Sequence, residues 1–135
     1  MGSRRYNAPS VGTKKGPMEF YYKDVEKDVL ILSADGGLNA DNADEFVREL
    51  ETLVESGIRK LVVDCSKLSY ISSYGVSILV RLRSKLAKRG GEVKLASVQN
   101  SIVTLLEIAD LHKIFGIYSN VDEALLAFNS EGQEA

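Results

Sequence analysis

The 135-residue sequence has no tryptophan, a single cysteine, a single histidine and no long apolar run. One cysteine excludes an internal disulfide, and Cys65 lies in an apolar stretch, so we expect a small buried residue in a reducing compartment. No stretch approaches the roughly 18–20 apolar residues that a membrane-spanning helix needs, and no signal peptide is recognisable. These absences predict a cytoplasmic protein without a membrane segment.

The scarcity of histidine limits the chemistry. His112 cannot build a His-rich metal site alone, and no CxxC or HExxH spacing occurs, so we expect no metal. Residues 35–37, Asp-Gly-Gly, lack the dinucleotide and Walker patterns, which favours a turn and no nucleotide cofactor. A Ser–His–Asp triad would have to recruit His112, and none of its neighbours directs it toward a serine. We therefore expect no enzyme; a hydrolase that uses Ser73 with His112 ranks last among our hypotheses.

Charge is unevenly distributed along the chain. The formal net charge is −2, but residues 1–17 contain four basic residues and no acid, which leaves 13 basic against 19 acidic residues in 18–135. A body with that balance is a poor nucleic-acid binder, because phosphate backbones need clustered Lys and Arg. Hydrophobic residues at 44% and charged residues at 27% are typical of one globular domain that fills its own core.

Apolar periodicity predicts alternating strands and helices. Residues 19–25 and 29–34 form a hairpin pattern, and 43–54 have an amphipathic helix pattern with Asn39 or Asp41 as N-cap and Gly57 as the stop. Further strands are expected at 61–63, 93–98 and 114–118, and further helices at 76–89, 100–109 and 121–128. The order β-β-α-β-α-β-α-β-α predicts a single α/β domain at 18–128, with helices packed on a mixed, mostly parallel sheet. Residues 1–17 are expected to form a flexible tail and 129–135 a polar one.

Two serines stand between the apolar strand at 61–63 and the helix that follows it. Hydroxyl groups at Ser72 and Ser73 can cap free backbone N–H groups at the helix start. The same helix N-terminus favours a phosphate electrostatically. Ser72 and Ser73 are therefore the candidate functional site, and a plain N-cap serine is the alternative interpretation of Ser73. Asp64, at the carboxyl end of the strand, is expected to accept hydrogen bonds from backbone N–H groups of the loop.

Residues 19–128 resemble a STAS domain, the fold of bacterial anti-sigma-factor antagonists. The resemblance rests on Gly37-Leu38 before a helix, Asp64-Cys65-Ser66 ending a strand, the hydroxyl-rich run 68–76 closed by Gly75, and the segment 111–115. It implies that an anti-sigma factor, which is also an ATP-dependent serine kinase, phosphorylates Ser73, with Ser72 as second choice. The unphosphorylated form would bind that partner and free a sigma factor, and phosphorylation would break the complex. The implied partner-binding residues are Asp64, Ser72, Ser73, Tyr74 and Gly75.

Two residues depart from the pattern of phosphorylated STAS domains. Ser72 stands where such members typically have Asp, and Tyr74 stands where they have a small residue. Tyr74 is either an aromatic anchor for a partner or a ring lying over the helix start. The alternative hypothesis is a non-phosphorylated STAS scaffold or ligand-sensing module. A weak homodimer also stays open, because the paired N-terminal strands can leave a sheet edge exposed.

Overall fold

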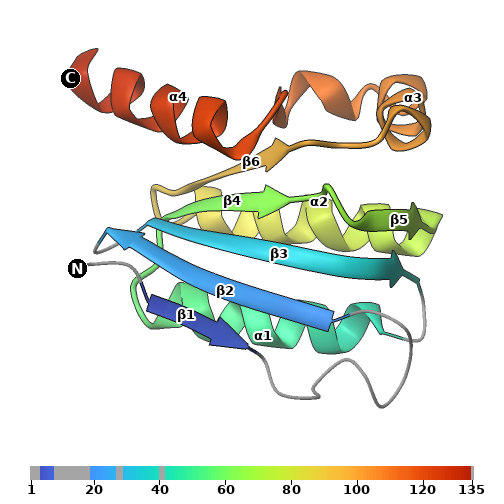
Figure 1. The fold of residues 1–135 in the computed structure, drawn as a ribbon, viewed down its shortest axis with the longest axis horizontal. Coiled ribbons are helices and arrows are strands. Elements are labelled where there is room, and N and C mark those ends of the chain that lie inside the picture. Colours follow the sequence, from blue (N-terminus) through green and yellow to red (C-terminus); the bar gives the residue numbers. More distant parts are fainter. Residues whose placement is uncertain (1–3, 8–18, 27–28, 40–41, 135) are drawn as a thin grey trace.

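A computed structural model describes residues 4–7, 19–26, 29–39 and 42–134. In this part of the chain strands and helices alternate around one sheet (Figure 1). The strands are β1 (Arg4–Asn7), β2 (Glu19–Glu26), β3 (Val29–Leu38), β4 (Lys60–Asp64), β5 (Leu68–Ile71), β6 (Glu92–Ala96) and β7 (Gly116–Tyr118). The α-helices are α1 (Ala43–Glu55), α2 (Ser73–Ala87), α3 (Asn100–Ile108) and α4 (Val121–Glu134), with a 3₁₀ helix η1 (Leu111–Lys113).

The sheet has the order β1-β2-β3-β4-β6-β7, and β5 pairs with the end of β3. Strands β1, β2 and β3 are antiparallel neighbours, which confirms the predicted hairpin of β2 and β3. All the remaining pairs are parallel, as expected for strands joined by helical crossovers. The predicted mixed, mostly parallel α/β fold is therefore confirmed.

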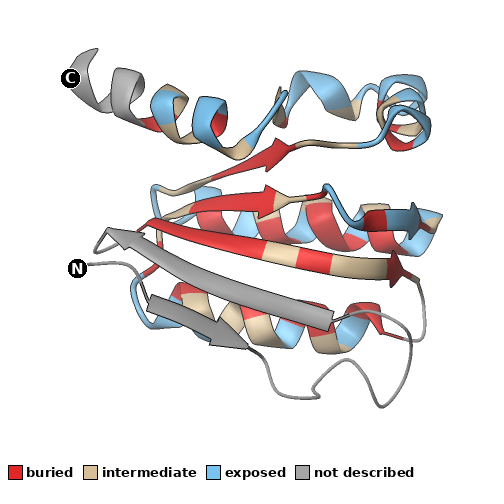
Figure 2. Ribbon diagram, in the orientation of Figure 1, coloured by how far each residue is buried: buried red, intermediate tan, exposed pale blue. Residues whose placement is uncertain are grey.

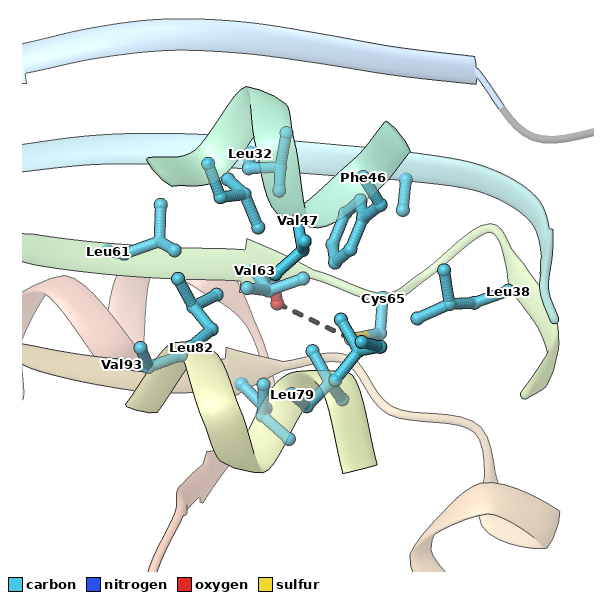
Figure 3. Packing of buried hydrophobic residues seen from close by; sticks show 14 of the residues in the cluster. Leu32, Leu38, Phe46, Val47, Leu61, Val63, Cys65, Leu79, Leu82 and Val93 are labelled. Carbon is cyan, nitrogen blue, oxygen red and sulfur yellow. Dashed lines mark hydrogen bonds between the residues drawn. The ribbon is translucent and has the colours of Figure 1, made fainter. Parts of the chain in front are cut away.

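The central strand β4 is buried on both faces, as its unbroken apolar run predicts. Leu61 and Val63 belong to the core under α1 and α2, whereas Val62 packs with Ala124 and Phe128 of α4 on the opposite face. Figure 2 shows the buried residues along β3, β4 and β6. In the larger core, side chains of α1 and α2 such as Phe46, Val47, Leu79 and Leu82 meet the sheet (Figure 3).

The prediction of a turn at residues 35–37 is wrong. Strand β3 continues to Leu38, and its register with β5 shifts between Gly36 and Gly37, where Gly36 has a φ of 118°. Such a φ suits glycine, which has no Cβ to collide with the backbone. Strand β5 lies in a segment for which the sequence predicts no strand. Its pairing with the end of β3 fixes the approach to α2, because the Ser72 N–H donates to the Leu38 carbonyl at 2.9 Å.

Helix ends follow the sequence at some positions and differ at others. Gly57 and Gly90 end their helices with φ values of +118° and +79°, as expected for glycine stops. The N-cap position of α1 is Asn42, not Asn39, while Asp41 lies outside the described residues. The buried Asn42 side chain donates to the Gly37 carbonyl at 2.8 Å and accepts from the Asn39 N–H at 3.0 Å. It thereby ties the end of β3 to the start of α1.

The ends of α3 and α4 also differ in part from the ranges that the sequence predicts. At the start of α4 the Asn120 side chain accepts a hydrogen bond from the Glu123 N–H at 2.8 Å and so caps the helix. For α3 the N-cap position is Gln99, and the helix begins at Asn100. Helix α4 extends to Glu134, so the segment expected to be a polar tail is largely helical, and β1 lies in the segment expected to be a flexible tail.

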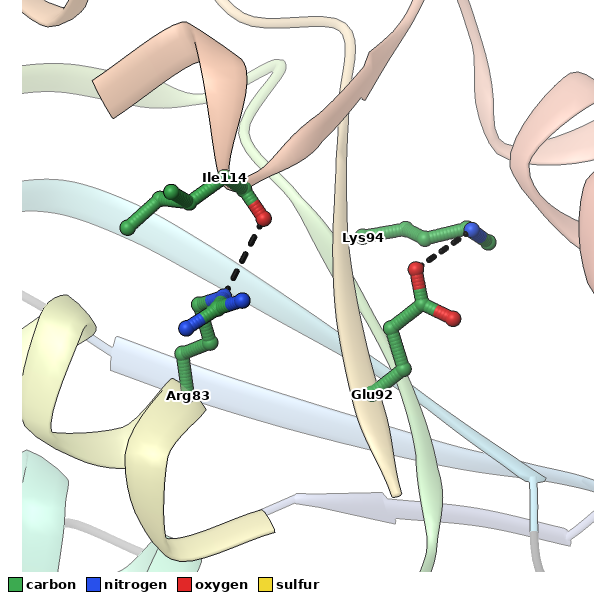
Figure 4. Close-up of polar contacts among 4 residues, drawn as sticks. All are labelled: Arg83, Glu92, Lys94 and Ile114. Atoms are coloured by element: carbon green, nitrogen blue, oxygen red, sulfur yellow. Dashed lines mark hydrogen bonds and ion pairs between the residues drawn. The ribbon is translucent and has the colours of Figure 1, made fainter. Parts of the chain in front are cut away.

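Two polar contacts hold the β6–β7 side of the domain together (Figure 4). The Arg83 Nε of α2 donates to the Ile114 carbonyl at 3.1 Å, which fastens the turn before β7 to α2. Lys94 of β6 is only 1% exposed, and its ammonium pairs with Glu92 at 2.9 Å and lies 4.6 Å from the centre of the Phe128 ring. The carboxylate and the aromatic face compensate the buried charge. Across the described ranges, no helix combines the length and apolar character needed to cross a bilayer.

Candidate functional site

The start of α2 assigns different tasks to its two serines. Ser72 has extended backbone angles, and its Oγ accepts a hydrogen bond from the Gly75 N–H at 3.0 Å. The helix continues from there, because the Val76 N–H donates to the Ser72 carbonyl at 2.9 Å. Ser72 is therefore the N-cap, and Ser73 is the first residue of the helix.

Ser73 is exposed at the N-terminus of α2. Its hydroxyl makes no hydrogen bond to any residue in the described part of the chain. His112, which a hydrolase would need as a base, is an exposed residue of η1 and makes no hydrogen bond to Ser73. The free backbone N–H groups of a helix start make this position electropositive, so the Ser73 hydroxyl stands where an added phosphate is favoured.

Gly75 is buried beneath this turn and shapes it by close packing. A Cβ at this position would lie 2.8 Å from Cγ1 of Ile71 and 2.9 Å from the carbonyl oxygen of Leu38. Only glycine lets the first turn of α2 approach the ends of β3 and β5 this closely. Gly75, expected among the partner-binding residues, thus supports the surface from below and exposes little of itself.

Tyr74 links the first turns of two helices. Its hydroxyl donates to Oδ1 of Asp44 at 2.8 Å, and 39% of the residue is exposed. This hydrogen bond raises the pKa of Tyr74 above its ordinary value of 10, because a phenolate cannot donate to a carboxylate. Desolvation and the charge of Asp44 act in the same direction, and the nearby positive charge of Arg81 opposes them. Tyr70 of β5 is 56% exposed, so tyrosines precede and follow the two serines on the surface.

Asp64 braces the loop after β4, as expected from its position. Its Oδ1 accepts from the Ser66 N–H at 3.0 Å and its Oδ2 accepts from the Ser33 hydroxyl at 3.4 Å. No hydrogen bond joins Asp64 to residues 72–75, all of which the structure describes.

Cys65 next to it is 2% exposed, which confirms the prediction of a buried residue. Burial, followed by the charge of Asp64, raises the pKa of the thiol to about 12. A thiol with that pKa is almost entirely protonated at neutral pH. Cys65 is therefore an unreactive part of the core.

Sequence reasoning missed two residues that shape the site. Neither Asp44, which accepts a hydrogen bond from Tyr74, nor Asn42, at the N-cap position of α1, is among the site residues expected from the sequence. Asp44 and Tyr74 are 30 residues apart, so no periodicity could have paired them. Among the described residues, no three His, Cys, Asp or Glu side chains gather as a metal site would require.

Comparison with known proteins decides the family. The family model of the STAS domain matches residues 22–124, which include the whole region from β3 to the start of α4. The chain belongs to the STAS domain family. A Thermotoga neapolitana protein with the proposed role of anti-sigma factor antagonist is 31% identical to this STAS domain over 107 residues, covering 78% of this chain and 94% of the relative.

Solved structures agree with this fold. A Thermotoga maritima protein with the same proposed role has a TM-score of 0.75 at 26% identity, covering 80% of this chain and 92% of the other. The phosphorylated form of the Bacillus cell fate determinant SpoIIAA has a TM-score of 0.66 at 14% identity, with 81% and 98% covered. The SpoIIAA comparison supports the STAS fold alone, because its sequence has diverged so far.

Proposed function

We propose that this STAS domain is an anti-sigma-factor antagonist that binds an anti-sigma factor with serine kinase activity and is released when Ser73 is phosphorylated. The described role of the Thermotoga relatives supports the antagonist part of the proposal. The phosphorylation part of the proposal rests on the different hydrogen bonding of the two serines at the start of α2. Ser72 is used as the cap, whereas Ser73 is exposed and its hydroxyl makes no hydrogen bond with a described residue.

The same difference favours Ser73 over Ser72 as the acceptor. A kinase that phosphorylated Ser72 would have to break the hydrogen bond from the Gly75 N–H and unwind the first turn of α2. Loss of such a cap costs about 0.5–2 kcal/mol. Phosphorylation of Ser73 leaves the cap in place, so the acceptor hydroxyl is available in the folded domain.

A phosphate on Ser73 adds about −1.5 to −2 charges at pH 7. The helix N-terminus favours that charge by about 0.3–1 kcal/mol, so the domain itself need not unfold. A partner packed over the same residue must remove water from the phosphate, which costs several kcal/mol when no cation compensates it. The balance favours release of the partner from a nearly rigid domain.

The proposed contact surface consists of Ser72, Ser73 and Tyr74, with Gly75 packed beneath them and Asp64 bracing the preceding loop. Such a switch requires ATP in the partner and no cofactor in this chain, and it would operate in the cytoplasm, where sigma factors act. The fixed orientation of Tyr74 by Asp44 also supports a second candidate, a STAS scaffold that holds its partner constitutively through the tyrosine.

A panel of purified anti-sigma factors with kinase domains from the source organism separates the two candidates. Each is incubated with ATP and the wild-type chain, Ser73→Ala or Ser72→Ala, and the products are analysed by intact mass and peptide mapping. One added phosphate in the wild type and in Ser72→Ala, and none in Ser73→Ala, supports the switch. No phosphate with any kinase, together with equal ATP-independent binding of wild type and Ser73→Ala, would refute it and leave the scaffold.

A further inference from the structure

Helix α2 is a basic segment in an acidic domain. From Ser73 to Gly91 the chain carries five Lys and Arg residues and no carboxylate, whereas the rest of 18–135 has eight basic and 19 acidic residues. Two of the five are engaged within the domain: Lys85 pairs with Glu51 of α1 at 3.1 Å, and Arg83 donates to the Ile114 carbonyl. The other three are Arg81, Lys88 and Arg89.

Two of these cations share an exposed face with the candidate acceptor. Ser73, Ser77, Arg81, Ser84 and Lys88 are all exposed, and their spacing of three or four residues keeps them on one side of the helix. We call this row the α2 stripe. Neither Arg81 nor Lys88 forms an ion pair with a residue in the described ranges. Within the described ranges the stripe therefore presents two cations without a salt bridge beside small hydroxyl side chains, and Lys88 also lines a shallow pocket with Glu51 and Glu55 of α1.

The neighbouring helix has the opposite charge. Helix α1 carries five carboxylates and only one basic residue, and its Asp44 lies against Tyr74 at the serine end of α2. Charges of opposite sign on adjacent helices restrict how a partner can dock, because like charges in contact are costly. A complementary partner surface is acidic where it covers α2.

We propose that the α2 stripe binds an acidic face of the protein partner. Arg81 and Lys88 attract this face, and phosphorylation of Ser73 releases it. The inference rests on the proposed function. It adds to that function the charge of the partner's contact surface and the residues of this chain that the partner covers. Arg81 lies about 12 Å along the helix from Ser73, beyond the Debye length of about 8 Å in physiological salt. The phosphate and the cations thus interact weakly in the free domain and strongly only when a partner excludes water.

This arrangement gives phosphorylation a second effect on the complex. A charge of about −1.5 to −2 on Ser73 nearly cancels the two cations of the stripe. An acidic partner face that was attracted along the whole row then meets repulsion at one end. Steering by such charges acts mainly on the association rate and weakens with salt.

The test uses the purified kinase from the panel above that binds the wild-type chain. Association rates are measured at low and high salt for the wild type, for Arg81→Glu/Lys88→Glu, and for the control Lys60→Glu/Lys113→Glu, which changes the net charge equally. Lys60 is half-buried at the start of β4, the end of that strand opposite the serine turn, and Lys113 belongs to η1. Thermal melts confirm that both variants are folded. We expect the stripe variant to associate about tenfold more slowly at low salt with a flattened salt dependence, and the control to match the wild type.

Equal effects of the two double variants, or a wild-type association rate that ignores salt, would overturn the inference while the proposed function stands. The inference would also be overturned if the wild type bound a labelled DNA duplex and the stripe variant did not. Arg81 and Lys88 would then bind nucleic acid and not a protein partner. If no kinase of the panel binds or phosphorylates the wild type, the proposed function fails and this inference falls with it.

Discussion

The hydroxyl of Tyr74 donates to Oδ1 of Asp44 at 2.8 Å, and this bond joins the first turns of α2 and α1 beside the exposed Ser73. Tyr74 departs from the small residue of phosphorylated STAS domains, and the bond gives the larger side chain a fixed orientation. The aromatic surface next to Ser73 is therefore ordered before any partner arrives.

The Tyr74–Asp44 bond has a titration signature. The carboxylate holds the pKa of Tyr74 above 10, so the bond's stabilising contribution is complete below pH 10 and is lost as the pH rises through the higher folded-state value. NMR of ¹³Cζ-labelled tyrosine is expected to show Tyr74 titrating above 10 in the wild type and closer to 10 in Asp44→Ala. Glu55→Ala, which removes a carboxylate from the other end of α1, should leave the Tyr74 titration unchanged. An unchanged titration in Asp44→Ala would contradict the contact.

The serines at the start of α2 should differ in their effect on stability. Ser72→Ala removes the hydrogen-bond acceptor of the Gly75 N–H and is expected to lower the free energy of unfolding by about 0.5–2 kcal/mol. Ser73→Ala removes no hydrogen bond with a described residue and should change it by less than about 0.5 kcal/mol. Urea denaturation of both variants measures this difference. The reverse order would make Ser73 the cap and remove the reason for its free hydroxyl.

Gly75→Ala tests the close packing beneath the turn. The added methyl group meets the Leu38 carbonyl at 2.9 Å and Cγ1 of Ile71 at 2.8 Å. Overpacking costs about 1–3 kcal/mol, and replacing glycine in a helix gains about 1 kcal/mol. Because one of the two close contacts is with a backbone oxygen, which cannot turn aside, we expect the cost to prevail and stability to fall. Gly37→Ala is a matched control, since its Cβ would meet the nearest atom at an ordinary 3.5 Å. If denaturation midpoints showed Gly75→Ala to be stabilising, α2 would not be seated as described.

Cys65 should resist alkylation in the folded protein. Its burial at 2% exposure and its pKa of about 12 leave almost no accessible thiolate at pH 8. Iodoacetamide is expected to label the chain after unfolding in guanidinium chloride and to label the native chain far more slowly, as followed by intact mass. The native protein of Ser33→Ala, which removes a partner of the neighbouring Asp64 but leaves the burial, serves as a control and should stay equally protected. Rapid native labelling would show that the β4 end is open.

The sequence predicts the helices and the central strands because their apolar patterns are long and regular. Strand β4 is an example, since Leu61, Val62 and Val63 are buried as an unbroken apolar run requires. Strand β5 escaped prediction because only its end residues, Leu68 and Ile71, are buried, a spacing that matches no strand period. The extension of β3 through Gly36 was hidden for a related reason: a β-bulge and a turn use the same glycine chemistry.

The sequence predicts which residues form the candidate site, but it does not predict which hydrogen bonds they make. Ser72, Ser73 and Tyr74 follow from a hydroxyl-rich turn before a helix, together with the resemblance to STAS domains. Which serine caps the helix depends on where β5 ends, because the pairing of Leu38 with the Ser72 N–H sets the first residue of α2. The partner of Tyr74 depends on the angle between α1 and α2, which no local pattern encodes.

The affinity of the kinase partner for the Ser73-phosphorylated domain tests the account most directly. Calorimetric titration compares the stoichiometrically phosphorylated chain with the unphosphorylated chain, and circular dichroism checks that both have the same fold. Desolvation of the phosphate predicts a loss of about 2.7 kcal/mol or more, which is about a hundredfold in Kd. Equal affinity of the two forms, or a loss of affinity that accompanies unfolding of α2, would contradict release by a local charge on a rigid domain.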